Sequence, residues 1–220
     1  MLVRDPEPEL MDEPDQARAY AAADFEGPNS HFVDLYAHYI GDSAGPVLDL
    51  GCGPGDIPLR LARRYPALRV DALDGAESML ILARQALERE PDLASRVRFI
   101  NGRIPDSELP HPVYDAVISN SLLHHLHEPD GLWRMICRVT RPGSGVLIMD
   151  LFRPADRESA AAIVDTYGAG EPDVLRRDFH HSLLAAFTPE EVRDQLRQAG
   201  LTGLRVDTIS DRHLLVHGTT

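Results

Sequence analysis

The sequence predicts a doubly wound α/β fold, in which helices cover both faces of a seven-stranded, mostly parallel sheet. Short apolar runs rich in branched residues alternate with longer segments of helical periodicity. One of these runs, at residues 47–50, passes directly into a turn with three glycines, and a helical segment follows at once. A chain of 220 residues has room for one such domain with modest additions.

The elements follow in order from this pattern. Two helices are expected before the first strand, at residues 16–23 and 30–40, with Gly27-Pro28 as the break between them. After the glycine turn, the next helix closes before Pro66. The later strands are expected at residues 68–73, 97–100, 115–119, 146–152, 204–206 and 214–217, the last two as a hairpin-like pair. The later helices are expected at residues 76–90, 131–140 and 188–200.

The chain divides into an arm and one domain. Residues 1–14 are rich in proline and acidic side chains, so we expect a loose arm there, followed by a single domain at residues 15–220. Residues 15–44 contribute its N-terminal helices. Residues 155–187 mix charged, imidazole and aromatic side chains near the strand ends, which favours an inserted lid that contacts the substrate.

Composition limits the partners. The chain has 22 basic and 35 acidic residues and a net charge of −13, which disfavours nucleic acid because phosphates need cationic contacts. A small-molecule substrate is expected instead. Cys52 and Cys137 give no disulfide framework, and free thiols fit a reducing cytoplasm. No apolar run has the length of a membrane span, and residues 1–7 lack the layout of a secretory signal, so we expect no membrane partner. The oligomeric state is not set by these features.

The glycine turn after the first strand is the main candidate for a ligand site. Glycine lets a ligand approach the backbone closely, and the start of the following helix presents free N–H groups. A dinucleotide fingerprint would place a third glycine at position 56, where this chain has Asp56. A second carboxylate, Asp49, lies in the strand just before the turn. Two anions there would repel a pyrophosphate and suit a cation.

Residues 47–55, Val-Leu-Asp-Leu-Gly-Cys-Gly-Pro-Gly, resemble the first motif of the class I S-adenosylmethionine (SAM)-dependent methyltransferases, whose sheet is Rossmann-like. The motif set is similar to that of the small-molecule, UbiE-like members. SAM carries a sulfonium and an ammonium group, which match the acidic surroundings. The resemblance implies SAM as the cofactor, held at its methionine part by Asp49, Gly51, Cys52 and Gly53. It also implies methyl transfer to a small-molecule nucleophile by in-line displacement.

The end of the second strand resembles the ribose site of this family, where an acid is followed by a methionine five residues later. Asp74 and Met79 match this pattern, about twenty residues after the glycine turn, and Asp71 does not. By this resemblance Asp74 holds the ribose hydroxyls with Gly75 beside it, and Met79 lies against the nucleoside. The alternative for Met79 is ordinary packing in the helix core.

The third strand leads into the segment that holds the adenine edge in this family. Here that segment is Gly102, Arg103 and Ile104, with Arg103 at the position of the usual acid. An arginine cannot accept a hydrogen bond from the adenine amino group, so we expect a backbone carbonyl or Asn101 to replace the acid.

The resemblance also gives the N-terminal helices a role, because such helices cover the cofactor and wall the substrate pocket in this family. Tyr20, Phe25 and His31 are the candidates for this wall. The alternative is that these helices only pack on the sheet, since an amphipathic helix needs an apolar face whatever its function.

Residues 119–129 resemble the fourth motif of the family, with a polar corner and paired histidines before an acid and a proline. We expect them beside the glycine turn, at the switch between the two halves of the sheet. Ser119 and Asn120 then lie at the reacting end of the cofactor, with Asn120 also a catalytic candidate. His124 is the first candidate for a substrate-side base, because imidazole titrates near neutrality, and His180 in the insert is the second.

The histidines at this corner have two other interpretations. Each of His124, His125 and His127 also suits a packing role with a hydrogen bond inside the loop. A metal site is the other alternative, but His124 and His125 are adjacent and project differently, and no paired cysteine or acidic triad accompanies them. We therefore predict no metal ligands.

Two other functions stay open. One is a nucleotide-dependent oxidoreductase that uses the same strand, turn and helix, although Asp56 argues against it. The other is a noncatalytic SAM-binding protein. The accepting atom is open as well, because the candidate pocket residues serve oxygen, nitrogen, sulfur and carbon alike.

Overall fold

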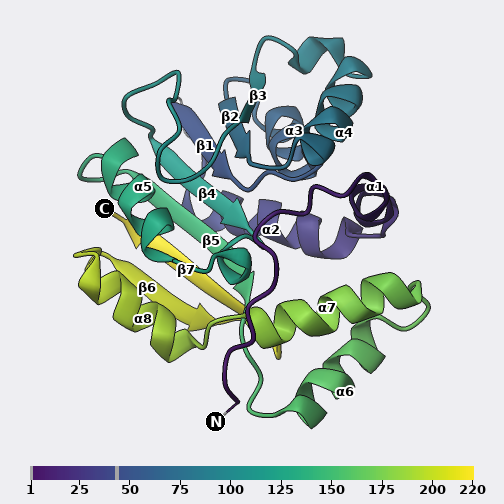
Figure 1. The fold of residues 1–220 in the computed structure, drawn as a ribbon. Helices are drawn as coiled ribbons and strands as arrows, with labels where there is room; N and C mark the ends of the chain where they lie inside the picture. The colour runs from purple at the N-terminus through teal and green to yellow at the C-terminus, as the bar shows by residue number, and fades with distance from the viewer. Residues whose placement is uncertain (1, 43–44) are drawn as a thin grey trace.

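The structure is a computed structural model, and it describes residues 2–42 and 45–220. A seven-stranded sheet lies at its centre with helices on both faces (Figure 1). The strands stand in the order β3-β2-β1-β4-β5-β7-β6, with bounds β1 Pro46–Leu50, β2 Arg69–Asp74, β3 Val97–Asn101, β4 Ala116–Asn120, β5 Gly145–Leu151, β6 Leu204–Thr208 and β7 His213–Thr219. β7 is antiparallel to β5 and β6, and the other pairings are parallel. The predicted doubly wound, mostly parallel fold is confirmed.

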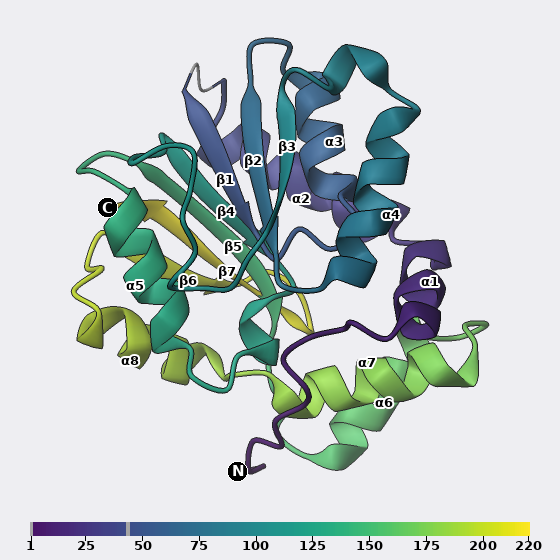
Figure 2. The same ribbon diagram turned by 45° about the horizontal axis from the view of Figure 1, so that its top comes forward.

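The helices form two layers. Their bounds are α1 Pro14–Ala22, α2 Glu26–Tyr39, α3 Asp56–Arg64, α4 Glu77–Glu88, α5 Asp130–Val139, α6 Arg157–Tyr167, α7 Asp173–Ala185 and α8 Pro189–Gln198, with 3₁₀ turns η1 Pro91–Leu93 and η2 Leu123–His125. α5 and α8 pack on one face of the sheet through Trp133 and Val192. α2 and α3 pack on the opposite face through Phe32 and Leu61, with α4 beside α3 (Figure 2). Because both faces are covered, the central parallel strands β1 and β4 are buried over most of their length and carry mostly apolar side chains.

The strand order reverses between β1 and β4, which are neighbours although β2 and β3 lie between them in the chain. Asp49 is in register with Ile118, so the carboxyl ends of the two strands open on the same edge of the sheet. The crevice at such a reversal is the usual ligand site of an open α/β sheet. The glycine turn and the residues after β4 meet there, as the sequence predicts.

The break between the first two helices differs from the prediction. α2 begins at Glu26, so Gly27 and Pro28 lie inside its first turn and not between the helices. Proline is tolerated in a first turn because the N–H groups there have no acceptor within the helix. The chain changes direction earlier, where the Asp24 carboxylate accepts a hydrogen bond from the Glu26 N–H (3.0 Å).

The N-terminal arm, residues 2–13, crosses the carboxyl end of the sheet on its way to α1 (Figure 2). The sequence predicts a loose segment, but the structure gives the arm specific partners. Arg4 donates to the carbonyl oxygens of Ala185 (2.5 Å) and His124 (2.9 Å). Asp12 accepts a hydrogen bond from the Ser78 N–H (3.0 Å). These partners lie far from the arm in the chain, so its own composition does not reveal them.

The predicted insert forms a helical hairpin of α6 and α7 at the same end of the sheet (Figure 1). The two helices pack together through a small apolar cluster that includes Ala160, Val164 and Leu183. The hairpin and the N-terminal arm therefore both lie at the carboxyl end of the parallel strands, the edge of the sheet at which a ligand is expected.

Candidate active site

A cavity of about 900 Å³ opens at the carboxyl ends of β1, β2 and β4. Side chains of the N-terminal arm and of the α6–α7 hairpin complete its walls. Figure 2 shows both segments beside the carboxyl end of the sheet. Its volume is within the range of small-molecule sites. Most of the predicted site residues line it, namely Asp49, Gly51, Cys52, Gly53, Asp74, Gly75, Met79, Gly102, Arg103, Ile104, Asn120 and His124.

The glycine turn adopts a backbone form that other residues disfavour. Gly51 has a φ of +74°, and its N–H donates to the Leu73 carbonyl (2.8 Å). A Cβ at position 51 would lie 2.8 Å from the Leu122 side chain, so both conformation and space favour glycine. Gly53 has a φ of +52°, and a Cβ there would meet nothing within 4 Å. At these two glycines the turn therefore presents backbone, and not a side chain, to the cavity.

Asp74 joins the glycine turn to the end of β2. Its Oδ2 accepts from the Gly53 N–H and its Oδ1 from the Ala76 N–H, both at 2.8 Å. Burial raises the pKa of this carboxyl, and the backbone N–H donors oppose the rise. Each carboxylate oxygen keeps the capacity to accept a second hydrogen bond. Asp71, the other acid of β2, accepts from the Tyr114 hydroxyl (2.8 Å) and does not line the cavity.

Two buried oxygen atoms of the cavity have no hydrogen-bond partner among the described residues, Asp49 Oδ2 and Asn120 Oδ1. Asp49 is 1% exposed, and burial together with the charge of Asp74 raises its pKa to about 8. A buried acceptor without a donor costs free energy, so the pair indicates a site that a ligand completes. A cation that carries N–H groups would supply what both atoms lack.

Asp56 does not share this role. Its Oδ2 accepts from Arg60 Nε (2.5 Å) and from the Asn29 amide (2.6 Å), so its charge is compensated at the start of α3. The second acid at the turn is therefore Asp74, and the sequence interpretation that paired Asp49 with Asp56 needs this correction. Asp49 and Asp74 are thus the two carboxylates at the turn that favour a cationic ligand.

His124 lies on η2, is 3% exposed and lines the cavity. Its Nδ1 is 2.5 Å from Oδ1 of Asp150, a fully buried residue of β5. The Oδ2 of Asp150 accepts from the Leu123 N–H (2.7 Å), which fixes the carboxylate in turn. Burial lowers the pKa of His124, but the Asp150 and Glu7 carboxylates together outweigh this effect and the net pKa is raised. Asp150 thus orients the ring and leaves Nε2 for another group.

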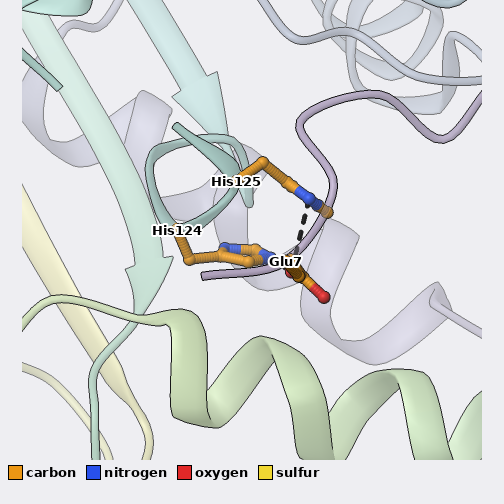
Figure 3. Close-up of side chains that lie close together, drawn as sticks. All are labelled: Glu7, His124 and His125. Carbon is orange, nitrogen blue, oxygen red and sulfur yellow. Dashed lines mark ion pairs between the residues drawn. The ribbon is translucent and has the colours of Figure 1, made fainter. Parts of the chain in front are cut away.

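The N-terminal arm brings Glu7 to the paired histidines (Figure 3). Its Oε1 lies 3.6 Å from His124 Nε2 and 3.3 Å from His125 Nδ1, and the centroids of the two imidazole rings are 4.2 Å apart. Burial raises the pKa of Glu7, whereas burial and the neighbouring His124 lower the pKa of His125 to about 3. Sequence reasoning missed Glu7, because nothing in an acidic, proline-rich arm marks one glutamate as a partner of distant histidines.

Two predicted site residues lie outside the cavity lining. Ser119 is fully buried, and its Oγ donates to the Leu50 carbonyl (2.7 Å), which ties β4 to β1. His180 lies on α7 and is not among the residues that line the cavity. Asn101, the suggested adenine acceptor, also lies outside the lining and donates its amide to Glu77 (2.9 Å).

The N-terminal helices contribute part of the cavity wall. Tyr20 and Phe25 line the cavity with their ring centroids 4.7 Å apart, and His31 does not line it. Met79 lines the cavity and also packs in a cluster with Ala17 of α1. Met79 therefore combines the two roles that the sequence offered as alternatives, packing in the helix core and lining the cavity.

Known proteins share both the fold and the motif region. A family model described as "Methyltransferase domain" matches residues 47–143, the stretch that holds the glycine turn, Asp74 and Asn120. An uncharacterized methyltransferase of Mycobacterium tuberculosis (strain ATCC 25618 / H37Rv) is 28% identical over 169 residues, 77% of this chain and 82% of the relative. A solved SAM-dependent methyltransferase from Aquifex aeolicus has the same fold, with a TM-score of 0.69, 18% identity and coverage of 94% of this chain and 97% of that chain. The chain is a class I SAM-dependent methyltransferase.

The methyltransferase is also similar to enzymes whose names give an acceptor. A trans-aconitate 2-methyltransferase of Azoarcus sp. (strain BH72) is 33% identical over 135 residues, which cover 61% of this chain and 50% of the relative. The chain thus spans about half the length of that relative.

Two general expectations can be compared with the structure of the methyltransferase. Cys52 and Cys137 are free thiols, as predicted, with Cys52 buried and Cys137 exposed. In the described part of the chain, no helix combines the length and the apolar character needed to cross a membrane.

Removing the charge of Asp49 should change how the stability of the unliganded methyltransferase depends on pH. The folded pKa of Asp49 is about 8 against an ordinary 3.8, so the folded state keeps a proton that the unfolded chain releases between these values. The stability that this group contributes is complete below its unfolded pKa and is lost as the pH rises through the folded pKa. Asp49→Asn should therefore unfold roughly a few degrees above wild type at about pH 8.5, with a difference that shrinks toward pH 4.

Thermal unfolding followed by circular dichroism at both pH values checks this expectation. Asp56→Asn is the matched control, because its carboxylate is already paired with Arg60 and its removal should not stabilise the protein. Equal unfolding temperatures for wild type and Asp49→Asn at the higher pH would contradict the assignment of Asp49 as an unpaired buried acid.

Proposed function

We propose that this methyltransferase transfers the methyl group of SAM to a small organic molecule that binds beside His124. SAM supplies an electrophilic methyl group on a positively charged sulfur. The observation that carries the proposal is the pair of unpaired acceptors, Asp49 Oδ2 and Asn120 Oδ1, at the glycine turn of the cavity. An ammonium group can donate to both atoms, and its charge would favour the ionised form of Asp49.

The residues around the turn support one orientation of the cofactor. The methionine part would lie against Asp49, Asn120 and the backbone of residues 51–53. The ribose hydroxyls would donate to Asp74, which retains free acceptor capacity. Met79 and residues 102–104 would contact the nucleoside and the adenine edge. Arg103 stands where the family usually has an acid, and Asn101 lies outside the cavity lining. Backbone carbonyls would therefore accept the hydrogen bond from the adenine amino group.

The acceptor would bind between η2 and the α6–α7 hairpin. His124 lines this part of the cavity from one side, and Leu175, Phe179 and Ser182 line it from the hairpin. Holding the acceptor in line with the methyl group supplies much of the rate of such a reaction. With its ring oriented by Asp150, His124 can hydrogen-bond to the acceptor or take a proton from it.

The names of the relatives indicate which acceptors to test first. Several are called trans-aconitate 2-methyltransferase, and trans-aconitate is a small carboxylic acid. We therefore take small carboxylic acids as the leading acceptor class. The free thiols Cys52 and Cys137 support the reducing cytoplasm as the place of this reaction.

Transfer of label from methyl-labelled SAM tests the proposal. The purified protein should convert SAM to S-adenosylhomocysteine and release an equal amount of labelled product, first with a panel of mono-, di- and tricarboxylic acids and then with a small-metabolite extract. Tight SAM binding without labelled product would instead favour a noncatalytic SAM-binding protein. Saturable binding of NADH without binding of SAM would favour an oxidoreductase.

A further inference from the structure

Three side chains able to bind a metal converge beside the cavity from separate parts of the chain. Glu7 comes from the N-terminal arm, and His124 and His125 come from η2 (Figure 3). One ligand atom of each residue lies within 4.8 Å of the other two. The Glu7 carboxylate oxygen is 3.3 Å from His125 Nδ1 and 3.6 Å from His124 Nε2.

These groups approach one another without forming hydrogen bonds. His125 Nδ1 is buried and has no hydrogen-bond partner among the described residues, and the 3.6 Å between Glu7 and His124 exceeds hydrogen-bond range. Two ligand atoms bound to one tetrahedral metal ion at about 2.1 Å lie about 3.4 Å apart, close to both observed distances. A cation between the three residues would therefore satisfy atoms that the protein leaves unsatisfied.

Neighbouring residues orient these side chains through hydrogen bonds, as the residues around the ligands of metal sites do. His124 has its Nδ1 2.5 Å from the Asp150 carboxylate, the arrangement that orients metal-binding imidazoles and strengthens them as ligands. The Ser182 hydroxyl donates to Glu7 Oε1 (3.0 Å). Arg4 donates to the backbone carbonyl of His124 (2.9 Å), which fastens the arm that carries Glu7 to the turn that carries the histidines.

We propose that Glu7, His124 and His125 bind a divalent transition-metal ion. Two imidazoles and one carboxylate form a ligand set typical of catalytic zinc and of non-haem ferrous sites, whereas Mg²⁺ and Ca²⁺ prefer oxygen ligands alone. The sequence predicted no metal ligands because the two adjacent histidines lacked a third partner. The arm supplies that partner from the far end of the chain.

Such an ion would have a role at the acceptor, and this part rests on the proposed function. Three protein ligands leave at least one coordination position open, and His124 and His125 both line the cavity. An oxygen atom of the acceptor, such as one from a carboxylate, would take the open position. The ion would then hold an anionic acceptor in a cavity that otherwise carries several acidic side chains, among them Asp49, Asp74 and Asp178.

Metal titration of the full-length protein after chelator treatment tests the site. Calorimetry with Zn²⁺ should show one ion bound per chain at micromolar affinity or tighter, and Mg²⁺ should give no saturable heat. Co²⁺ should give the visible absorption bands of a four- or five-coordinate site. His125→Ala and Glu7→Gln should each weaken Zn²⁺ binding at least about 10-fold. His181→Ala, which removes an exposed imidazole of α7 outside the cluster, should leave the affinity unchanged.

Glu7→Gln keeps the test decisive even where a histidine variant folds poorly, because it alters one atom of the arm and no residue of the sheet. Zn²⁺ binding without a fixed stoichiometry, or binding that both variants leave as tight as in wild type, would overturn the proposal. The titration contains neither SAM nor acceptor, so a negative result leaves the proposed function standing. Normal Zn²⁺ binding without methyl transfer would instead contradict the proposed function alone.

Discussion

His124→Ala should lower kcat by at least about 100-fold and leave the dissociation constant for SAM within about threefold of wild type. The ring lines the cavity beside the hairpin, held by Asp150, whereas the unpaired acceptors Asp49 and Asn120 lie at the glycine turn. Loss of the imidazole should therefore act on the acceptor and not on the cofactor. Steady-state rates at saturating SAM, together with calorimetry of SAM binding, measure the two quantities separately.

The third histidine of the same run provides the matched control. His127 is exposed and is not among the residues that line the cavity, and it contacts Glu7 only at the backbone carbonyl (2.7 Å), so His127→Ala should keep most of kcat. Equal losses in the two variants, or an unchanged kcat in His124→Ala, would contradict the role given to His124. His125→Ala separates the two ways in which His124 can act. A large loss favours the metal site, and a small loss favours a base that works alone.

Asp74→Asn should weaken SAM binding by about 3 kcal/mol, or roughly 100-fold in the dissociation constant. An amide carries no charge and offers one acceptor oxygen in place of two, and the N–H groups of Gly53 and Ala76 already compete for it. Calorimetry with SAM and with S-adenosylhomocysteine measures the loss. Thermal unfolding of the unliganded variant shows how much of the loss comes from a loosened glycine turn.

Asp71→Asn is the control for this experiment, because it alters the other acid of the same strand. Asp71 accepts from the Tyr114 hydroxyl and lies outside the cavity lining, so the variant should lose stability and keep its affinity for SAM. If Asp74→Asn bound SAM as well as wild type did, Asp74 would not be the ribose acceptor.

The strands and the glycine turn could be predicted because their signals are local. A buried parallel strand is a short, mostly apolar run, so the predicted strands at residues 68–73 and 146–152 are close to the observed bounds of β2 and β5. Gly51 and its neighbours were recognisable because the turn needs residues without a side chain. The positions of Asp49, Asp74 and Asn120 followed from these elements, since each lies within or at the end of a strand that opens on the cavity.

Ser119 is a predicted site residue that the structure places outside the cavity lining. Successive side chains of a strand point to opposite sides, so Ser119 and Asn120 do not both face the same cavity. Asn120 lines it, while Ser119 turns inward to the Leu50 carbonyl. Glu7 and Asp150 could not be found for a different reason. Each meets His124 through the tertiary fold, and no spacing in the sequence connects either residue to it.

The walls of the cavity come from two sources. Residues 47–143, which the methyltransferase family model matches, supply the glycine turn, Asp74 and the paired histidines. The N-terminal arm, and the α6–α7 hairpin that we propose borders the acceptor, also line the cavity and lie outside that stretch. Two proteins can therefore share the matched stretch, and with it the same methyl donor, and still act on unrelated molecules. A search for the natural substrate, or an effort to graft a new specificity onto this scaffold, should begin with the two flanking pieces.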